Sequence, residues 1–310
     1  MKTISEPGIF DIPAEDYHAD PCPAPSLSSS IARALLTQSP AHAWCAHPRL
    51  NPNFEREERE LFDLGKTAHT LMLGDIRKFA VLAFDDWRTK DAKAARDAAY
   101  AAGKTPILAH KMVMVERMID AGRAQIAAHR EIPDAFDPAL GKPEQTIVWQ
   151  ENGVWLRVRL DWLLNSHAVI YDFKTTGQST EPDAWGRYLF NESLDVQAAL
   201  YQRGLSAVTG KTAQFRFVVI ETEPPFAMCA VQLTPAAMDL AQRKVDRAIA
   251  IWAACLESDR FPGYPARVAH LDPPPYIEAK WMEREERDPP TKEMLAQMLH
   301  WQAPHKEAAE

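Results

Sequence analysis

Two neighbouring strand-like segments, each carrying a carboxylate, constrain the fold of this chain more than any other feature. They lie in residues 158–176, VRLDWLLNSHAVIYDFKTT, with Asp161 in the first segment and Asp172 in the second. Side chains alternate between the two faces of a strand, so Asp172 and Lys174 share one face and Phe173 takes the other. The pattern predicts a sheet that brings two carboxylates and a lysine together.

These residue types suit a divalent-metal site that hydrolyses phosphodiesters. Carboxylates hold hard Mg²⁺ or Mn²⁺ ions, and a bound ion lowers the pKa of its water and stabilises charge on the phosphate. Lys174 can orient that water or neutralise the developing charge. The alternative is a surface ion pair between Asp172 and Lys174. The apolar neighbours Ile170, Tyr171 and Phe173 argue against it, because charged residues are rare in such strands.

The order of the expected elements predicts the fold class. Strand patterns occur at 79–84, 146–150, 153–164, 168–174, 215–221 and 226–233. Helical patterns occur at 28–38, 40–47, 57–73, 90–102, 110–129, 182–191, 194–209, 235–257 and 292–301. Elements mixed in this way predict an α/β (α+β) fold with a central mixed β-sheet flanked by helices.

Composition divides the chain into three expected regions. Residues 1–55 are irregular with short helices, residues 56–260 carry the sheet and the long helices, and residues 261–310 are proline-rich and charged. We expect the middle region to be the core domain and the last to be a tail.

Bulk charge and cysteine content exclude some classes of protein. Lysine and arginine number 35 against 43 aspartates and glutamates, a net charge of −8, which argues against a basic, non-specific DNA-coating protein. A local basic groove on an acidic body stays compatible with a nuclease. Four scattered cysteines without a CxxC pair favour reduced thiols in a cytoplasmic protein over an iron–sulfur cluster. Without a signal peptide or an apolar run of membrane length, we expect no membrane association.

Two further pairs of residues have helical spacing. Gly65 and His69 share a helix face, so the glycine could let that helix approach the sheet while His69 points at the metal. The alternative for His69 is a packed or capping histidine. Gln197 and Tyr201, also four apart, could bond a phosphate or the attacking water. Ordinary helix-surface residues would look the same.

Three more charged residues complete the candidate set. Arg157 and Arg159 share the strand face of Asp161 and could hold DNA phosphates, although alternating arginines also occur on solvated faces. Glu144 precedes the first strand of the group and is either a further carboxylate for a second metal or a loop residue.

Taken in order, G-x-x-x-H, R-x-D, D-x-K-T and Q-x-x-x-Y resemble the motifs of the PD-(D/E)XK nuclease superfamily, and more narrowly its RecE-like branch, the exonuclease VIII C-terminal domain. The residues that carry the resemblance are Gly65, His69, Arg159, Asp161, Asp172, Phe173, Lys174, Thr175, Gln197 and Tyr201. Tyr17-His18, the SLSSS run and SPAHAW are similar to the region before the core in many phage and prophage members. The resemblance covers residues 15–260. The proline that names the superfamily is absent before Asp161, and the tail has no counterpart.

The resemblance implies a role for each residue. It makes His69, Asp161, Asp172 and the Phe173 carbonyl metal ligands, Lys174 the residue that orients or activates the water, and Gln197 and Tyr201 contacts to DNA or braces of the site. Glu144 would be a further acidic residue.

It also implies an activity: Mg²⁺-dependent digestion of linear double-stranded DNA ends from 5′ to 3′, with Mn²⁺ as a substitute ion. The 3′ single-stranded tails serve recombination. A RecT-type single-strand annealing protein is the implied partner, and a ring-like homo-oligomer the implied assembly.

Two other functions stay open from the sequence. One is an endonuclease or a CRISPR-adaptation-like nuclease, which the missing cysteine cluster and the phage-like N-terminal region disfavour. The other is a catalytically silent DNA-binding or partner-docking module. A binding module needs no metal cage, so the presence of Asp161, Asp172 and Lys174 together argues against it.

Overall fold

A computed structural model describes residues 3–54, 63–74, 79–287 and 292 of the chain. The chain divides into two compact units, Met1–Gly263 and Tyr264–Glu310, and the first of them holds both sheets. Within the described residues, no helix combines the length and apolar character that a membrane crossing requires. All four cysteines are free thiols, and Cys22 and Cys255 are buried.

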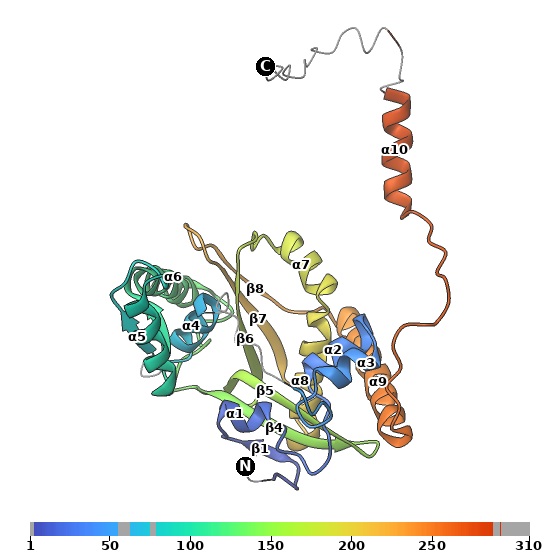
Figure 1. Cartoon of the computed structure of the whole chain (residues 1–310), viewed down its shortest axis with the longest axis horizontal. Helices are drawn as coiled ribbons and strands as arrows, with labels where there is room; N and C mark the ends of the chain where they lie inside the picture. The colour runs from blue at the N-terminus through green and yellow to red at the C-terminus, as the bar shows by residue number, and fades with distance from the viewer. Residues whose placement is uncertain (1–2, 55–62, 75–78, 288–291, 293–310) are drawn as a thin grey trace, which may run out of the picture. The chain divides into compact units, whose positions relative to one another are not determined.

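A six-stranded sheet forms the centre of the first unit (Figure 1). Its strands, in spatial order, are β1 (Gly8–Phe10), β4 (Gly141–Glu151), β5 (Val154–Leu164), β6 (Val169–Thr176), β7 (Gln214–Glu221) and β8 (Met228–Val231). All neighbours are antiparallel except β6 and β7, which run parallel. The expected mixed sheet flanked by helices is therefore confirmed.

Helices cover the sheet from two sides, and each side has its own hydrophobic core (Figure 1). The helices of the first core are α2 (Ser29–Thr37), α3 (Pro40–Cys45), α7 (Pro182–Asn191), α8 (Leu194–Thr209) and α9 (Pro235–Ser258). Those of the second core are α4 (Asp63–Met72) and α6 (Ala109–Ala128). Trp149, Trp185 and Trp252 are buried in the first core, while Trp162 and Tyr171 are buried in the second. The sheet thus lies between two apolar layers, which explains how a strand such as β6 can be buried over most of its length.

Local signals in the sequence set the helix ends. The side chain of Ser28 accepts a hydrogen bond from the Ile31 N–H at the start of α2, and Thr234 caps α9 in the same way just before Pro235. Helix α8 ends at Gly210, which adopts the left-handed conformation that glycine tolerates. These caps explain why the boundaries of the long helices were predictable.

Several elements were not expected from the sequence. Residues 1–25 contain β1 and the short helix α1 (Ala14–His18). Strand β2 (Phe79–Leu82) and helix α5 (Lys90–Ala101) were expected, but β3 (Thr105–Leu108) and its parallel pairing with β2 in a second sheet were not. Residues 57–62, where the helix expected at 57–73 begins, lie outside the described residues. So does nearly all of the helix expected at 292–301.

The second unit contains one described helix, α10 (Pro275–Arg287), within a segment that the sequence presented as a tail of prolines and charges. None of its residues is buried. The Arg284 guanidinium lies 5.7 Å from the ring centre of Trp281, both on the helix itself.

Candidate active site

The candidate site lies where the ladder between β5 and β6 ends. The two strands pair only at Trp162↔Tyr171 and Leu163↔Ile170. Continuing that antiparallel register by one position places Asp161 opposite Asp172, the first pair beyond the ladder. The sheet therefore brings the two predicted carboxylates together at the point where its own hydrogen bonding stops.

Asp172 is fully buried and is held by two side chains. The Nε2 atom of Gln197 on α8 donates to its Oδ1 at 2.6 Å, and the Lys174 ammonium lies 2.5 Å from its Oδ2 as an ion pair. Burial raises the pKa of Asp172 to about 6; Lys174 opposes the rise and the charge of Asp161 adds to it. A carboxylate with a raised pKa beside a second carboxylate is typical of functional sites.

Asp161 is held from the other side. Its Oδ1 lies 3.0 Å from Nε2 of His69, and its Oδ2 accepts a hydrogen bond from the Phe173 N–H at 2.9 Å. Burial works to raise the pKa of Asp161, but His69, Lys174 and the Phe173 N–H together hold that pKa below its usual range. Asp161 is therefore the carboxylate that stays ionised.

Both basic side chains of the site, Lys174 and His69, keep their protons more strongly than usual. Burial opposes the charge on Lys174, but the ion pair with Asp172 and the charge of Asp161 leave its pKa raised. Burial likewise opposes protonation of His69, and Asp161 outweighs it, so the pKa of His69 is raised. Each of the two carboxylates thus has one basic side chain beside it, Lys174 beside Asp172 and His69 beside Asp161.

Gly65 explains how α4 brings His69 to the sheet. A β-carbon at residue 65 would come within 3.1 Å of the Thr175 Oγ1 on β6, closer than most real contacts. His69 follows one helical turn later on the same face. The expected close approach of this helix to the sheet is present.

The donor set fits a hard divalent cation. Asp161, Asp172 and His69 bring oxygen and imidazole ligands, and Asp172 Oδ2 is buried without a directional hydrogen bond. The Phe173 N–H points toward β5, so its carbonyl points the same way and not into the β6–β7 ladder. Within the described part of the chain, no three His, Cys, Asp or Glu side chains are already grouped around an ion position. The present partners of the two carboxylates, His69 and Lys174, would have to give way in part to a metal.

Gln197 and Tyr201 both lie on the buried face of α8 and are almost excluded from solvent. Gln197 bonds Asp172 directly, and Tyr201 lies near Ser29 of α2. Burial raises the pKa of Tyr201 well above its usual value, and the nearby charges of Tyr17, Asp172 and Asp161 add to the rise. This placement leaves both side chains little exposed surface and puts Gln197 in direct contact with a site carboxylate.

The two strand arginines have different surroundings. Arg159 donates to the Ile12 carbonyl at 2.8 Å and to Glu144 Oε2 at 2.9 Å. Glu144 lies on β4 between the paired positions Pro143↔Trp162 and Gln145↔Leu160, which places it opposite Asp161 on the neighbouring strand β5. Arg159 and Glu144 therefore border the site as an ion pair.

Arg157 is a correction to the sequence prediction. Only 3% of the residue is exposed, and its guanidinium lies 3.2 Å from Asp20 and donates to the Ser26 carbonyl at 2.9 Å. It also lies 5.5 Å from the ring centre of Tyr17. A guanidinium enclosed in this way fastens the N-terminal segment to β5 and offers no contact to DNA.

One residue of the site was missed by sequence reasoning. Arg33 of α2 lies near enough to Lys174 for its charge to act on the pKa of Lys174. Its Nε is buried without a hydrogen-bond partner in the described residues, and its one ion pair, with Glu192, spans 3.6 Å. Ser29 and Arg33 are four residues apart on α2, so their side chains lie on the same face of that helix. That spacing was readable in the sequence, but nothing linked it to a strand about 140 residues later.

Comparison with known proteins places this arrangement in a wider context. The crystal structure of a protein from Eubacterium rectale described as "putative exonuclease" has a similar fold, with a TM-score of 0.54 and 12% sequence identity. The match covers 87% of this chain and 98% of that one. A second solved structure, that of SSO0001, is 14% identical and covers 67% of this chain and 97% of its own, but its TM-score of 0.26 carries no weight. A search of curated proteins gave no match.

The family match is broader than either structural match. Residues 28–272 match the family described as "PDDEXK-like domain of unknown function (DUF3799)", a span that includes every candidate ligand and the helices that brace them. With this match over most of its length, the chain belongs to the PDDEXK-like family DUF3799, and the expected membership in the PD-(D/E)XK nuclease superfamily is confirmed.

Proposed function

We propose that this protein is a metal-dependent exonuclease that digests linear double-stranded DNA from its 5′ ends and leaves 3′ single-stranded tails. The observation that carries the proposal is the pair Asp161 and Asp172 at the end of the β5–β6 ladder, with Lys174 2.5 Å from Asp172. A binding module would gain nothing from burying two like charges side by side, because burial of a charge is costly.

The residues divide the chemistry between them. Asp161, Asp172, His69 and the Phe173 carbonyl are the groups that would hold a divalent ion, which when bound supplies an activated water and stabilises charge on the phosphate. Mg²⁺ suits a site rich in carboxylates, and Mn²⁺ accepts both carboxylate and imidazole ligands.

Lys174 is the proton-bearing group nearest the reacting atoms. Its raised pKa keeps it an ammonium, so its role is to orient the water and neutralise charge on the phosphate rather than to remove a proton. Gln197 fixes the orientation of the Asp172 carboxylate through its 2.6 Å bond, and Tyr201 packs behind it on the same helix.

The test is digestion of linear duplex DNA labelled at one 5′ or one 3′ end, with Mg²⁺ or with EDTA, beside a closed circle. Early release of the 5′ label, only with metal and only from linear DNA, is the expected result. Lys174→Ala should abolish the release, and Lys111→Ala, an exposed lysine on α6, should leave it unchanged. Cutting of the circle would indicate an endonuclease, and no cutting with any metal would indicate a binding module.

The proposed reaction has consequences for partners. A 3′-tailed product is the substrate of a RecT-type single-strand annealing protein, so we include such a partner and a role in recombination in the proposal. A ring-like homo-oligomer would retain the DNA between cleavage steps. Light scattering of the purified protein tests the assembly, and a stable monomer that still degrades DNA processively would contradict it.

A further inference from the structure

A cavity beside β1 has no part in the proposed nuclease chemistry. It measures about 360 Å³, the lower end of the range for small-molecule sites. Its lining comes from the N-terminal segment, β1, α1 and the turn that follows, namely Thr3, Ile4, Ser5, Glu6, Phe10, Ile12, Asp16 and Pro21. We call it the N-terminal pocket.

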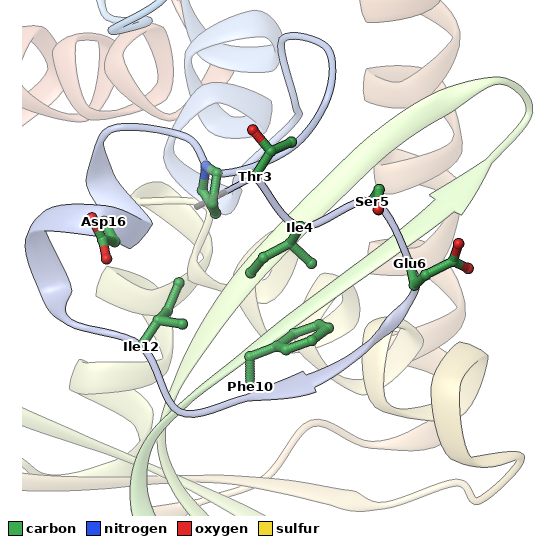
Figure 2. A pocket seen from close by; sticks show the side chains of 8 residues that line it. Thr3, Ile4, Ser5, Glu6, Phe10, Ile12 and Asp16 are labelled. Atoms are coloured by element: carbon green, nitrogen blue, oxygen red, sulfur yellow. The ribbon is translucent and has the colours of Figure 1, made fainter. Parts of the chain in front are cut away.

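The interior of the N-terminal pocket is apolar. Figure 2 shows the side chains of Ile4, Phe10 and Ile12 around a common space, and each of the three is only partly buried. A hydrogen bond from the Ile4 N–H to the Pro21 carbonyl, 2.8 Å long, fastens the N-terminal segment over it. Three partly exposed apolar side chains around one cavity favour an apolar ligand group, since each would lose contact with water on binding.

The charged residues among those described as lining the pocket are both acidic. Glu6 and Asp16 lie at opposite ends of it (Figure 2), and among the described residues neither carboxylate has a hydrogen bond or an ion pair. No lysine or arginine is among the described residues that line the cavity, and residues 3–20 contain five acidic residues and no lysine or arginine. The unpartnered carboxylates therefore favour a cation and disfavour an anion such as a nucleotide.

From this combination we propose that the N-terminal pocket binds an organic cation with an apolar body. A free aromatic or aliphatic amine has this chemistry, and so does a peptide in which a basic residue adjoins an apolar one. The pocket and the active site are neighbours. The carbonyl of Ile12, whose side chain lines the cavity, accepts the hydrogen bond from Arg159, and Arg159 holds Glu144 across from Asp161.

The test uses three probes of similar shape and different charge on the full chain. They are 2-phenylethylamine, 2-phenylethanol and 3-phenylpropionate, with binding followed by NMR titration. We expect the amine to bind about tenfold more tightly than the alcohol, because a charge-assisted contact adds to the same apolar burial, and the carboxylate to bind least. Equal affinities for the three probes, or no saturable binding of the amine, would overturn the proposal.

Variants locate the binding. Asp16→Asn and Glu6→Gln should each weaken amine binding severalfold and leave alcohol binding unchanged, while Ile4→Ala should weaken both. Glu15→Gln removes an exposed acid of α1 outside the pocket and is the matched control. If Asp16→Asn does not fold, raising the salt concentration on the unaltered protein gives the same information: it should weaken the amine alone. If the affinity for the amine changes neither with salt concentration nor in the Glu6→Gln variant, the cation binds elsewhere.

A fourth probe separates the two sources of the ligand. The peptide acetyl-Lys-Phe-amide presents the same cation and ring on a backbone. Tighter binding of the peptide than of 2-phenylethylamine would identify a protein partner, and the reverse would identify a free amine. The readout is independent of DNA cleavage, so its outcome does not bear on the nuclease assignment.

Discussion

Gly65 on α4 and Thr175 on β6 lie so close that a β-carbon at residue 65 would stand 3.1 Å from the Thr175 hydroxyl oxygen. His69 lies one turn along the same helix and reaches Asp161 at 3.0 Å. The distance between helix and strand therefore decides where the imidazole stands.

Gly65→Ala tests this relationship. Alanine favours a helix by roughly 1 kcal/mol over glycine, so the free energy of unfolding should change little. The added methyl group should push α4 away from Thr175 and reduce cleavage by about tenfold, since small displacements at a reacting centre are costly. Adding Thr175→Ala should restore much of the activity. A double variant as impaired as Gly65→Ala would show that the contact is not the cause.

Asp172→Asn should separate activity from stability. The pKa of Asp172 is raised to about 6 in the fold, so its stabilising contribution is present below its unfolded pKa of about 4 and lost as the pH rises through 6. Asparagine mimics the protonated form and keeps the bond from Gln197. At pH 7.5 we expect the free energy of unfolding to be unchanged or higher by up to about 3 kcal/mol, while cleavage falls by at least about a thousandfold. Urea denaturation and a cleavage assay measure the two, and marked destabilisation would contradict the burial argument.

The Asp20–Arg157 ion pair predicts a pH dependence of stability at the acid end. Burial works to raise the pKa of Asp20, but a hydrogen bond from His47, the charge of Arg157 and hydrogen bonds from Ser26 hold that pKa below its usual value. A depressed pKa stabilises the fold above the unfolded pKa, and that stabilisation is lost as the pH falls through the lower, folded value. Acid titration followed by urea denaturation should therefore show stability falling below about pH 4.

Asp20→Asn is the matching substitution. Asp20 has a φ of +66°, a conformation that asparagine also tolerates, so the backbone should be preserved. The buried Arg157 guanidinium would lose its partner, at a cost of about 3 kcal/mol in the free energy of unfolding at pH 7. A loss below about 1 kcal/mol would mean that the N-terminal segment is held by its apolar contacts alone.

Arg33→Ala should weaken DNA binding without removing the chemistry. The Nε of Arg33 is buried, but its side chain is 32% exposed and its Nη2 atom lies 3.6 Å from Glu192, so a phosphate can reach the exposed part of the guanidinium. We expect weaker binding of every DNA sequence and a salt dependence smaller by about one counterion. Arg117→Ala, an exposed arginine of α6, serves as the control. A slope that stays unchanged would exclude a phosphate contact at Arg33.

The sequence was informative wherever a local pattern and a tertiary contact agree. Asp161, Asp172 and Lys174 lie on adjacent strands joined by a short turn, so alternation and hairpin geometry were enough to bring them together. His69 was predicted from the Gly65 spacing, although its distance from Asp161 needed the structure.

Prediction failed where two distant segments meet. Arg157 carries the same signal as Arg159, and only the N-terminal segment that covers it makes it structural. Strand β1 pairs with β4 over three residues, too few for a periodic pattern. Strand β3 contains Pro106 and pairs in parallel with β2, a combination that strand signals in a sequence disfavour.

The end of the β5–β6 ladder has a consequence for how mutants of this protein are interpreted. Asp161 accepts the Phe173 N–H, a bond that the neighbouring strand would have made had the ladder continued. The residue thus closes a gap in the sheet as well as being a proposed metal ligand. In an inactive Asp161→Ala protein, the Phe173 amide would lack its hydrogen-bond acceptor and β6 would be held less firmly. Its loss of activity would then have a structural cause as well as the loss of a metal ligand. The side-chain carboxylate of Asp172 is held by the side chains of Gln197 and Lys174, so its replacement leaves no backbone amide without a partner.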